Sequence, residues 1–389
     1  MNQISRVGAI ARARDIAPVI AAQADAIERE RRLTAPVLDA LHDARLFRMF
    51  LARAFGGDEL HPAECMQAVE EVSRQDGSVG WCLFTACSGT LLAPYLQPEA
   101  AWAVYGDPRA TSAWGPPNKS EARAAPGGYV LTGCWRFASG CRHAAWMGAH
   151  GPVREPDGGL RRDRAGNPVT RSFMFPAHEA RLIDDWNTMG LRGTASDSYE
   201  VEELFVPEAF SGTREDPAAR TLPGKLFAFT QFGLYTVGSA AVALGIARGL
   251  LDGFGALARD KTPRGLTRLA ESAVVQTQFA QTEARLSAAR AFLLQALHEA
   301  WDVAEETTLL PLPPRLRVRL AALHAIEAAA AVADYAYKAA GSDAIFPEAG
   351  FERRFRDMHT LTQQTQARLA NFEPVGRLLL CREGDSPTM

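Results

Sequence analysis

Histidine and cysteine are the residue types that can take part in the widest range of reactions, and this chain has eight histidines and six cysteines. Their spacing argues against a metal site. No histidines form a ligand pair at helical spacing, and no cysteines form a CxxC pair. The sequence also lacks a GxGxxG fingerprint after a strand, a glycine-rich loop ending in Gly-Lys-Ser/Thr, an HExxH motif and a GxSxG elbow. We therefore expect no metal site and no ordinary nicotinamide or nucleoside-triphosphate chemistry.

Aromatic and hydroxyl side chains instead gather in short segments. Residues 128–140 read GYVLTGCWRFASG, and residues 185–196 read DWNTMGLRGTAS. Residues 205–207 read FVP, and residues 353–357 read RRFRD. From the pattern alone, Trp135 belongs to a strand core and Ser139 starts a turn.

In this order, the four segments resemble the acyl-CoA dehydrogenase-like flavoproteins, over nearly the whole chain. The WxFxSG form of the first segment is more similar to the flavin-dependent monooxygenases of that family, the group D oxygenases, than to the dehydrogenases. The resemblance implies an α+β fold, with an N-terminal helical domain, a middle β domain and a C-terminal four-helix bundle. It also implies a reduced flavin (FMN or FAD) as cofactor, a separate flavin reductase as partner, and a homotetramer.

The same resemblance implies roles for individual residues. Trp135 would pack against the isoalloxazine, and Ser139 would act near flavin N5, because a flavin that holds activated oxygen needs a dry pocket with a hydrogen-bonding group there. The segment Arg192–Ser196, including Arg192 and Thr194, would supply donors around flavin or substrate, unless Gly193 only closes a hairpin. Trp114 lies in the segment that lines the flavin in relatives, although a proline-ordered loop explains it almost as well.

Two more cofactor residues are implied at a distance. Arg264 and Gln276 fall roughly where the family places an arginine and a glutamine that reach the cofactor of a neighbouring subunit. A solvated arginine is the simpler alternative for Arg264.

The catalytic base is where the sequence departs from the family pattern. Acyl-CoA dehydrogenases usually carry a glutamate near the start of the last helix, but residues 358–366 read MHTLTQQTQ, without a carboxylate. Many group D oxygenases carry a histidine seven residues beyond the aspartate, where this chain has Gln364. An amide can orient a substrate but cannot take its proton. His359 lies five residues earlier, roughly 140° away around a helix, so it cannot simply replace that histidine.

Apolar spacing and the frequency of glycine and proline along the chain predict the helices and strands that position these residues. Residues 9–105 show helical apolar spacing, residues 106–215 are rich in glycine, proline and short alternating runs, and the chain is helical again from about residue 225. We expect domains at 1–105, 106–215 and 216–389. Residues 129–132 and 199–202 are predicted strands, and residues 321–340 a predicted helix.

The composition of the chain limits the kinds of partner that it could bind. A formal net charge of −3 gives no reason to expect nucleic acid. Residues 226–247 carry no charge, but they lack aromatic belts and are expected to form a buried helix rather than a membrane span. No secretory signal is recognisable, and the cysteines fit reduced thiols, so we expect a cytoplasmic protein.

Together these observations favour a flavin-dependent monooxygenase acting on a small substrate that is aromatic or contains a heteroatom. An acyl-CoA dehydrogenase-type dehydrogenase and a non-catalytic member of the fold remain the alternatives.

Overall fold

The computed structural model describes residues 7–163, 166–214 and 216–381. Five helices come first: α1 (Ala9–Glu30), α2 (Ala35–Asp43), α3 (Pro62–Gln75), α4 (Gly77–Gly89) and α5 (Pro98–Tyr105). They begin where the sequence supplies start signals. Pro36, Pro62 and Pro98 occupy the first turns of α2, α3 and α5, where a missing N–H costs nothing.

Eight strands follow: β1 (Ser112–Trp114), β2 (Pro117–Ala125), β3 (Gly128–Ala138), β4 (Trp146–Arg154), β5 (Thr170–Pro176), β6 (Arg181–Ile183), β7 (Asp197–Pro207) and β8 (Ser211–Gly212). Their order in the sheet is β6-β7-β3-β2-β4-β5-β8, and β1 pairs with β4. Both predicted strands are confirmed, because residues 129–132 lie in β3 and residues 199–202 in β7.

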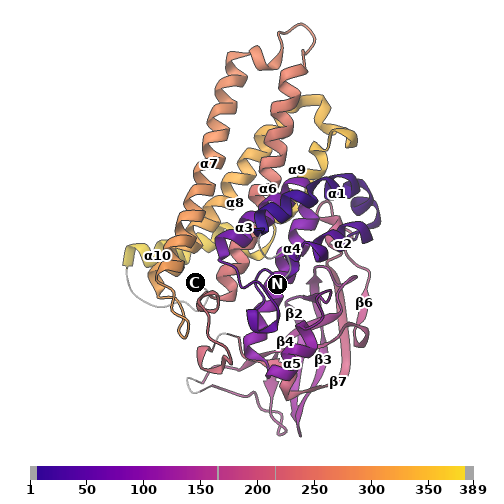
Figure 1. Cartoon of the computed structure of the whole chain (residues 1–389), viewed down its shortest axis with the longest axis vertical. Coiled ribbons are helices and arrows are strands. Elements are labelled where there is room, and N and C mark those ends of the chain that lie inside the picture. Colours follow the sequence, from indigo (N-terminus) through magenta and orange to yellow (C-terminus); the bar gives the residue numbers. More distant parts are fainter. Residues whose placement is uncertain (1–6, 164–165, 215, 382–389) are drawn as a thin grey trace.

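The described part of the chain ends in five helices: α6 (Gln231–Asp260), α7 (Ala273–Asp302), α8 (Leu312–Ala340), α9 (Phe351–Leu361) and α10 (Phe372–Cys381). Figure 1 shows α6, α7 and α8 rising side by side, with the turn between α6 and α7 at one end of the molecule and the sheet at the other. The short helix α9 packs on α6 and α8 as the fourth member of this bundle.

Within the described residues, α6 is the one helix long and apolar enough to span a membrane, and 83% of its apolar window is buried inside the protein. It is the buried core helix that the uncharged stretch predicts.

Three hydrophobic cores hold these elements. The largest joins α1–α5 to α6–α9 continuously, and the second is enclosed by the sheet, around Trp135, Tyr199 and Phe173. A small third core packs α10 on α8. The N-terminal helices and the bundle therefore share one core, while the sheet has its own. The order helix, sheet, helix is as expected; the division into three domains at the stated boundaries stays a prediction.

Candidate functional site: the end of strand β3

Strand β3 loses its regular pairing just before it ends, and this exposes an aromatic ring. The register against β7 shifts between Trp135 and Ala138, and Phe137 has a φ of 61°. A left-handed φ is costly for a bulky residue, so it needs support from its surroundings. Its ring is 51% exposed and meets the half-buried Trp186 edge-on, with 6.1 Å between centroids. Phe137 and Trp186 thus present an open apolar face.

The expectation for Trp135 does not fit this geometry. Its indole is completely buried in the sheet core, where it stacks on Tyr199 and donates through Nε1 to the carbonyl of His150 at 2.8 Å. A cofactor cannot touch a side chain that has no exposed surface. In a regular strand, residues 135 and 137 would point to the same face; the irregularity between them turns Phe137 outward. Phe137, not Trp135, offers a surface to a flat ring.

Ser139 begins a chain of hydroxyl groups directly behind that surface. Trp81 Nε1 on α4 donates to Ser139 Oγ at 2.9 Å. Ser139 Oγ and Ser196 Oγ lie 2.7 Å apart, as do Ser196 Oγ and Thr194 Oγ1. Thr194 Oγ1 then donates to the carbonyl of Leu191 at 2.8 Å.

The number of protons fixes the direction of this chain. Three hydroxyl protons must serve three oxygen contacts, and Thr194 uses its own on Leu191. Ser196 must therefore donate to Thr194, and Ser139 to Ser196, since any other choice leaves two oxygens 2.7 Å apart with no proton between them. The unused hydrogen-bonding capacity of Ser139 is then a lone pair, so Ser139 is an acceptor towards the site.

The loop carrying Thr194 is held from several sides. Leu191 and Ala195 flank the short helix η6 (Arg192–Thr194), and both adopt positive φ values, 50° and 43°. Gly140 N donates to the carbonyl of Thr194 at 2.8 Å, which ties this loop to the end of β3. Thr194 has no exposed surface, so it can support a cofactor only through Ser196 and Ser139.

A buried carboxylate anchors the same loop to the bundle. Asp357 Oδ1 on α9 accepts from Leu191 N at 2.6 Å. Burial, followed by the neighbouring Asp76 carboxylate, raises the pKa of Asp357 above the ordinary aspartate range. Asp76 caps α4 by accepting from the N–H groups of Ser78 and Val79. One pair of acids therefore joins α4, η6 and α9.

Arg192 faces away from the hydroxyl chain. Its Nη1 donates to the carbonyl of Thr188 at 3.0 Å, and its Nε lies 3.4 Å from Glu28 Oε1. The structure thus places Arg192 on the outer side of the loop, where contact with a cofactor stays a prediction.

Trp114 lies in a second cluster, with the guanidinium of Arg214 4.4 Å above its ring and His150 beside it. Arg214 donates to His150 and to Gln231, and His150 Nδ1 pairs with Ser172 Oγ at 2.8 Å. Burial, followed by the charge of Arg214, lowers the pKa of His150 well below its ordinary value, which keeps the ring neutral.

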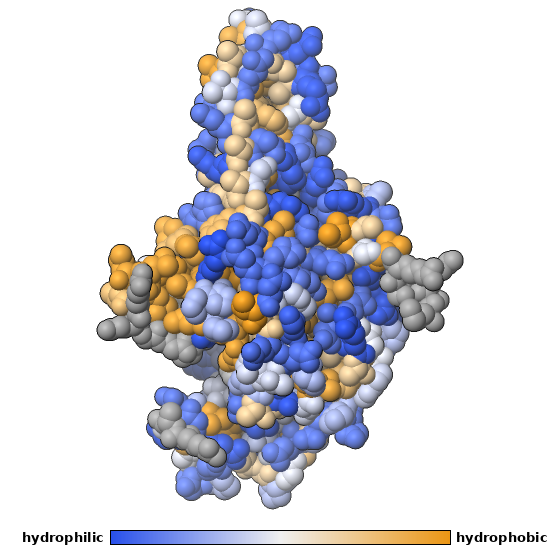
Figure 2. All heavy atoms as spheres, turned by 60° about the vertical axis from the view of Figure 1, so that its left-hand side comes forward, coloured by the Kyte–Doolittle hydropathy of each residue, from blue (hydrophilic) through white to orange (hydrophobic). Residues whose placement is uncertain are grey.

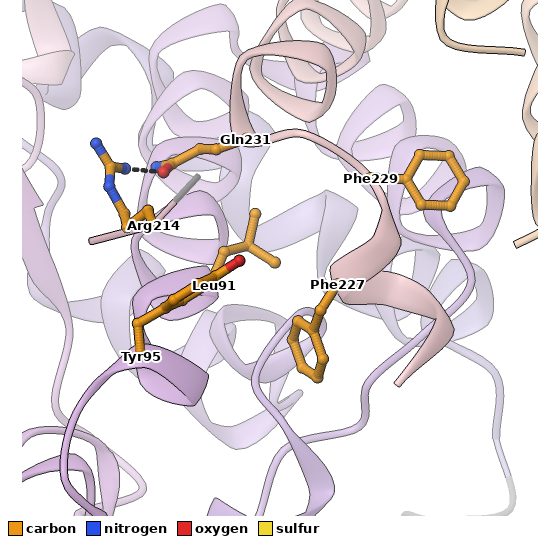
Figure 3. A pocket seen from close by; sticks show the side chains of 6 residues that line it. All are labelled: Leu91, Tyr95, Arg214, Phe227, Phe229 and Gln231. Carbon is orange, nitrogen blue, oxygen red and sulfur yellow. Dashed lines mark hydrogen bonds between the residues drawn. The ribbon is translucent and has the colours of Figure 1, made fainter. Parts of the chain in front are cut away.

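A small cavity adjoins this cluster. Its volume is about 20 Å³, and its lining is Leu91, Tyr95, Arg214, Phe227, Phe229 and Gln231. Figure 3 shows the Arg214–Gln231 hydrogen bond at one end of the cavity, with Leu91, Tyr95 and Phe227 beside and below it. A cavity of this volume has room for about one water molecule.

The structure does not bring His359 or Gln364 into contact with the hydroxyl chain. His359 Nε2 pairs with Asp334 Oδ1 on α8 at 2.9 Å and packs on Phe355. Helix α9 ends at Leu361, so the helical rotation expected between His359 and Gln364 does not apply. Gln364 instead sits in a turn, where its Oε1 accepts from Gln366 N at 2.6 Å. Their catalytic roles stay predictions.

Arg264 and Gln276 lie around the turn between α6 and α7, at the far end of the bundle. Both side chains are exposed, and Gln276 Nε2 donates to the carbonyl of Ala270 at 2.8 Å. Neither contacts the site within this chain, which is compatible with the predicted contact to another subunit.

Sequence reasoning missed two members of the site. Trp81 carries no signal, because it sits on an apolar helix among core residues. Phe137 was visible only as part of WxFxSG, whereas Ser196 belongs to the segment 192–196 that was expected to supply donors. The hydroxyl residues 139, 194 and 196 become one group only through the packing of β3 against η6.

Comparison with known proteins identifies the family. Residues 11–98 match the N-terminal domain of acyl-CoA dehydrogenase, and residues 237–368 match its C-terminal domain, together more than half of the chain. Indole-3-acetate monooxygenase from Pseudomonas putida is 28% identical over 92% of this chain and 89% of its own length. The oxygenase component of the FADH(2)-dependent resorcinol hydroxylase from Rhizobium sp. is 29% identical over 75% and 73%.

Solved structures agree on the fold. The 3-HSA hydroxylase from Rhodococcus sp. RHA1 superimposes with a TM-score of 0.88 at 21% identity, covering 98% of this chain and 99% of that one. XiaF from Streptomyces sp., in complex with FADH2 and glycerol, gives a TM-score of 0.88 at 25% identity, covering 98% and 97%. With both domain models matched in order around the central sheet, the chain belongs to the acyl-CoA dehydrogenase family.

Proposed function

We propose that this protein is the oxygenase component of a two-component flavin-dependent monooxygenase that acts on a small aromatic substrate. It would receive reduced flavin from a separate reductase, insert one atom of O2 into the substrate and release the other as water. Named relatives over most of the chain are monooxygenases or hydroxylases of this kind, among them one for indole-3-acetate and one for resorcinol.

The observation that carries the proposal is the acceptor character of Ser139 behind the open face of Phe137. Reduced flavin has an N–H at N5, whereas oxidised flavin has a bare acceptor nitrogen there. A Ser139 whose proton is committed to Ser196 complements the reduced form and opposes the oxidised one. The half-exposed Phe137 and Trp186 would cover the ring system, and bound reduced flavin would supply the two electrons that activate oxygen.

The remaining residues would exclude water from the flavin site and determine its shape. Trp81 fixes Ser139, and Phe84 and Tyr235 continue the aromatic wall from Trp81 towards α6. Thiol chemistry is not favoured there, because burial raises the pKa of Cys82 and that of Cys141.

We further propose a homotetramer located in the cytoplasm, with no membrane or nucleic-acid partner. Figure 2 shows apolar side chains gathered around the mid-height of the molecule, while the protruding helices are mostly hydrophilic. Exposed leucines at residues 369, 379 and 380 add apolar surface suited to contact between subunits.

The test compares the affinities of the full-length protein for reduced and oxidised flavin under anaerobic conditions, followed by mixing with oxygen. Reduced flavin should bind at least about tenfold more tightly than oxidised flavin. The N5–H of reduced flavin can donate a hydrogen bond to Ser139, whereas the bare N5 of oxidised flavin would face a second acceptor. Oxygen should then produce a transient absorbance distinct from those of both flavin states. Equal affinities without a transient, together with reduction of a dye by an acyl-CoA substrate, would support a dehydrogenase instead.

A further inference from the structure

A cleft opens between the first two helices and the loop that follows β3. Its volume is about 470 Å³, and it lies between the last turns of α1, the start of α2 and residues 142–143. Pockets for small organic molecules typically have about 300–1,000 Å³. Neither Phe137 nor Ser139 lines this cleft, so it is separate from the proposed flavin face.

His143 lines the cleft with an imidazole that has no hydrogen-bond partner. Within the described residues nothing bonds to either ring nitrogen, and neither nitrogen belongs to the fully enclosed polar atoms without a partner, so both keep accessible surface. The backbone of His143 is fixed on both sides. Its N donates to the carbonyl of Gly140 at 3.1 Å, and Thr111 Oγ1 donates to its carbonyl at 3.4 Å. The imidazole is therefore held in place while its hydrogen-bonding groups stay unused.

The charge state of His143 decides what it can offer a ligand. Burial, followed by the neighbouring His42, lowers the pKa of His143 to about 4. At neutral pH the ring is uncharged and carries one N–H donor and one bare acceptor nitrogen. Gln23 on α1 also lines the cleft, and its amide makes no hydrogen bond within the described chain. The cleft thus offers neutral donors and acceptors.

The charged groups at the cleft are already paired. Arg142 Nε donates to Asp197 Oδ2, and Arg142 Nη2 donates to Asp184 Oδ1, both at 2.6 Å. Arg32 Nε lies 3.5 Å from Glu30 Oε2 on the exposed rim. An anionic ligand would have to compete with these carboxylates and lose its own hydration, so the cleft favours an uncharged ligand.

The rest of the lining favours a flat ring. Four apolar residues contribute to the walls: Leu33, Ala35, Pro36 and Leu38. Behind His143, a row of rings continues through Phe47 to His42, with 6.5 Å and 4.9 Å between successive centroids. An aromatic ligand packed against the imidazole would extend this row.

We propose that this cleft is a binding site for a small uncharged phenol, whose hydroxyl group hydrogen-bonds to the imidazole of His143 while its ring packs on the apolar walls. The binding needs neither flavin nor oxygen. Only its place in the reaction rests on the proposed function, because hydroxylation of an aromatic ring yields a compound of this class.

The experiment measures binding of phenol, toluene and benzoate to the full-length protein by ligand-observed NMR, without flavin. Toluene has the shape of phenol but lacks the hydroxyl group, and benzoate carries the charge that the cleft disfavours. The wild type should bind phenol at least about threefold more tightly than either. His143→Leu should weaken phenol binding by about three- to tenfold, the effect of one hydrogen bond, and change toluene binding by no more than about twofold.

His178 provides the matched control. It is an exposed histidine on the short helix η5 (Ala177–Glu179), so His178→Leu removes an imidazole elsewhere on the molecule. It should leave all three affinities unchanged. If His143→Leu does not fold, magnetisation transfer from phenol to the methyl groups of Leu33 and Leu38 in the wild type locates the ligand, and its absence would contradict the site.

Three further results would overturn the inference: a wild type that does not bind phenol, one that binds toluene or benzoate as tightly as phenol, or a folded His143→Leu variant with the wild-type affinity for phenol. None of these depends on turnover. A protein that binds phenol through His143 but gives no oxygen-dependent transient would refute the proposed function and leave the phenol site standing.

Discussion

At the scale of single residues, the direction of the hydroxyl chain makes Ser196 the residue that sets what Ser139 can do. Ser196→Ala frees the proton of Ser139, which can then point into the site as a donor. The variant should therefore lose most of the preference for reduced flavin, by up to about tenfold in the ratio of affinities. Anaerobic titrations with both flavin states measure that ratio.

Ser139→Ala is the companion variant. It removes the acceptor and leaves Trp81 Nε1 buried without a partner, so it should also lower the free energy of unfolding by about 1–3 kcal/mol. An unchanged affinity ratio in both variants would mean that Ser139 only forms a turn.

Phe137 and Trp135 should differ sharply when each is truncated. Trp135→Ala empties a fully buried site and should lower the free energy of unfolding by about 3–5 kcal/mol. Phe137→Ala changes a half-exposed side chain, so its cost should stay within about 1 kcal/mol while flavin binding weakens. Denaturant titrations and flavin titrations give both quantities. Weak flavin binding by a stable Trp135→Ala protein, with normal binding by Phe137→Ala, would reverse the assignment.

The family resemblance predicts a histidine at the position of Gln364, and the turn there can accept one. His61 already caps α3 by accepting from the N–H two residues later, at 2.9 Å, as Gln364 accepts from Gln366. Gln364→His should therefore fold normally and keep its Nε2 available as a base. Hydroxylation of a phenol should accelerate by about 10²-fold, the lower end of general-base effects. Steady-state rates with a phenol and with an indole test this; fast phenol turnover by the wild type with no gain in the variant would place the base elsewhere.

Single residues also show what a sequence pattern cannot predict. The segment WxFxSG locates the site, but the pattern cannot say which aromatic ring is exposed. That depends on a pairing irregularity between β3 and β7, whose strands lie about sixty residues apart in the sequence. Trp135 is the larger ring and the more conspicuous choice, yet the fold uses it for the core.

At the scale of elements, Asp357 connects the loop of the site to α9, and this makes stability depend on pH. Its pKa is raised in the folded state, so the folded protein binds a proton that the unfolded chain releases above about pH 4. The free energy of unfolding should consequently fall as pH rises from about 4 towards neutrality. Asp357→Asn keeps an acceptor for Leu191 N and should flatten this dependence. Thermal unfolding across that pH range compares the two proteins; parallel curves would show that Asp357 is ionised in the fold.

Elements with strong local patterns were predictable, and those set by caps and tertiary contacts were not. The long helices and strands β3 and β7 follow directly from apolar spacing. Helix α9 stops at Leu361 although no proline or glycine marks the place, because the chain turns there and Gln364 caps the next turn. The rotation argument for His359 failed at this boundary, since it assumed a helix continuing to residue 364.

At the scale of the whole molecule, one core joins the N-terminal helices to the bundle, while Arg264 and Gln276 project at the end remote from the sheet. No contact within the described chain links these two residues to Ser139 or Phe137. The composition and apolar spacing of the sequence predict the sheet and the long helices, whereas a contact of Arg264 and Gln276 with another subunit is implied only by the family resemblance. If Arg264 serves a cofactor, it serves that of another subunit.

Mixed oligomers test that arrangement. Phe137→Glu should block the flavin face, and Arg264→Glu should block the distant contribution, so each variant alone should bind flavin poorly. If every site combines Phe137 of one subunit with Arg264 of another, random mixing of the two variants should restore roughly a quarter of the sites. The two variants are refolded together or coexpressed, and the flavin bound per oligomer is compared with that of each variant alone. Light scattering establishes the number of subunits. No recovery in a confirmed mixed oligomer would mean that each chain completes its own site; a monomer that binds reduced flavin normally would remove the need for a partner altogether.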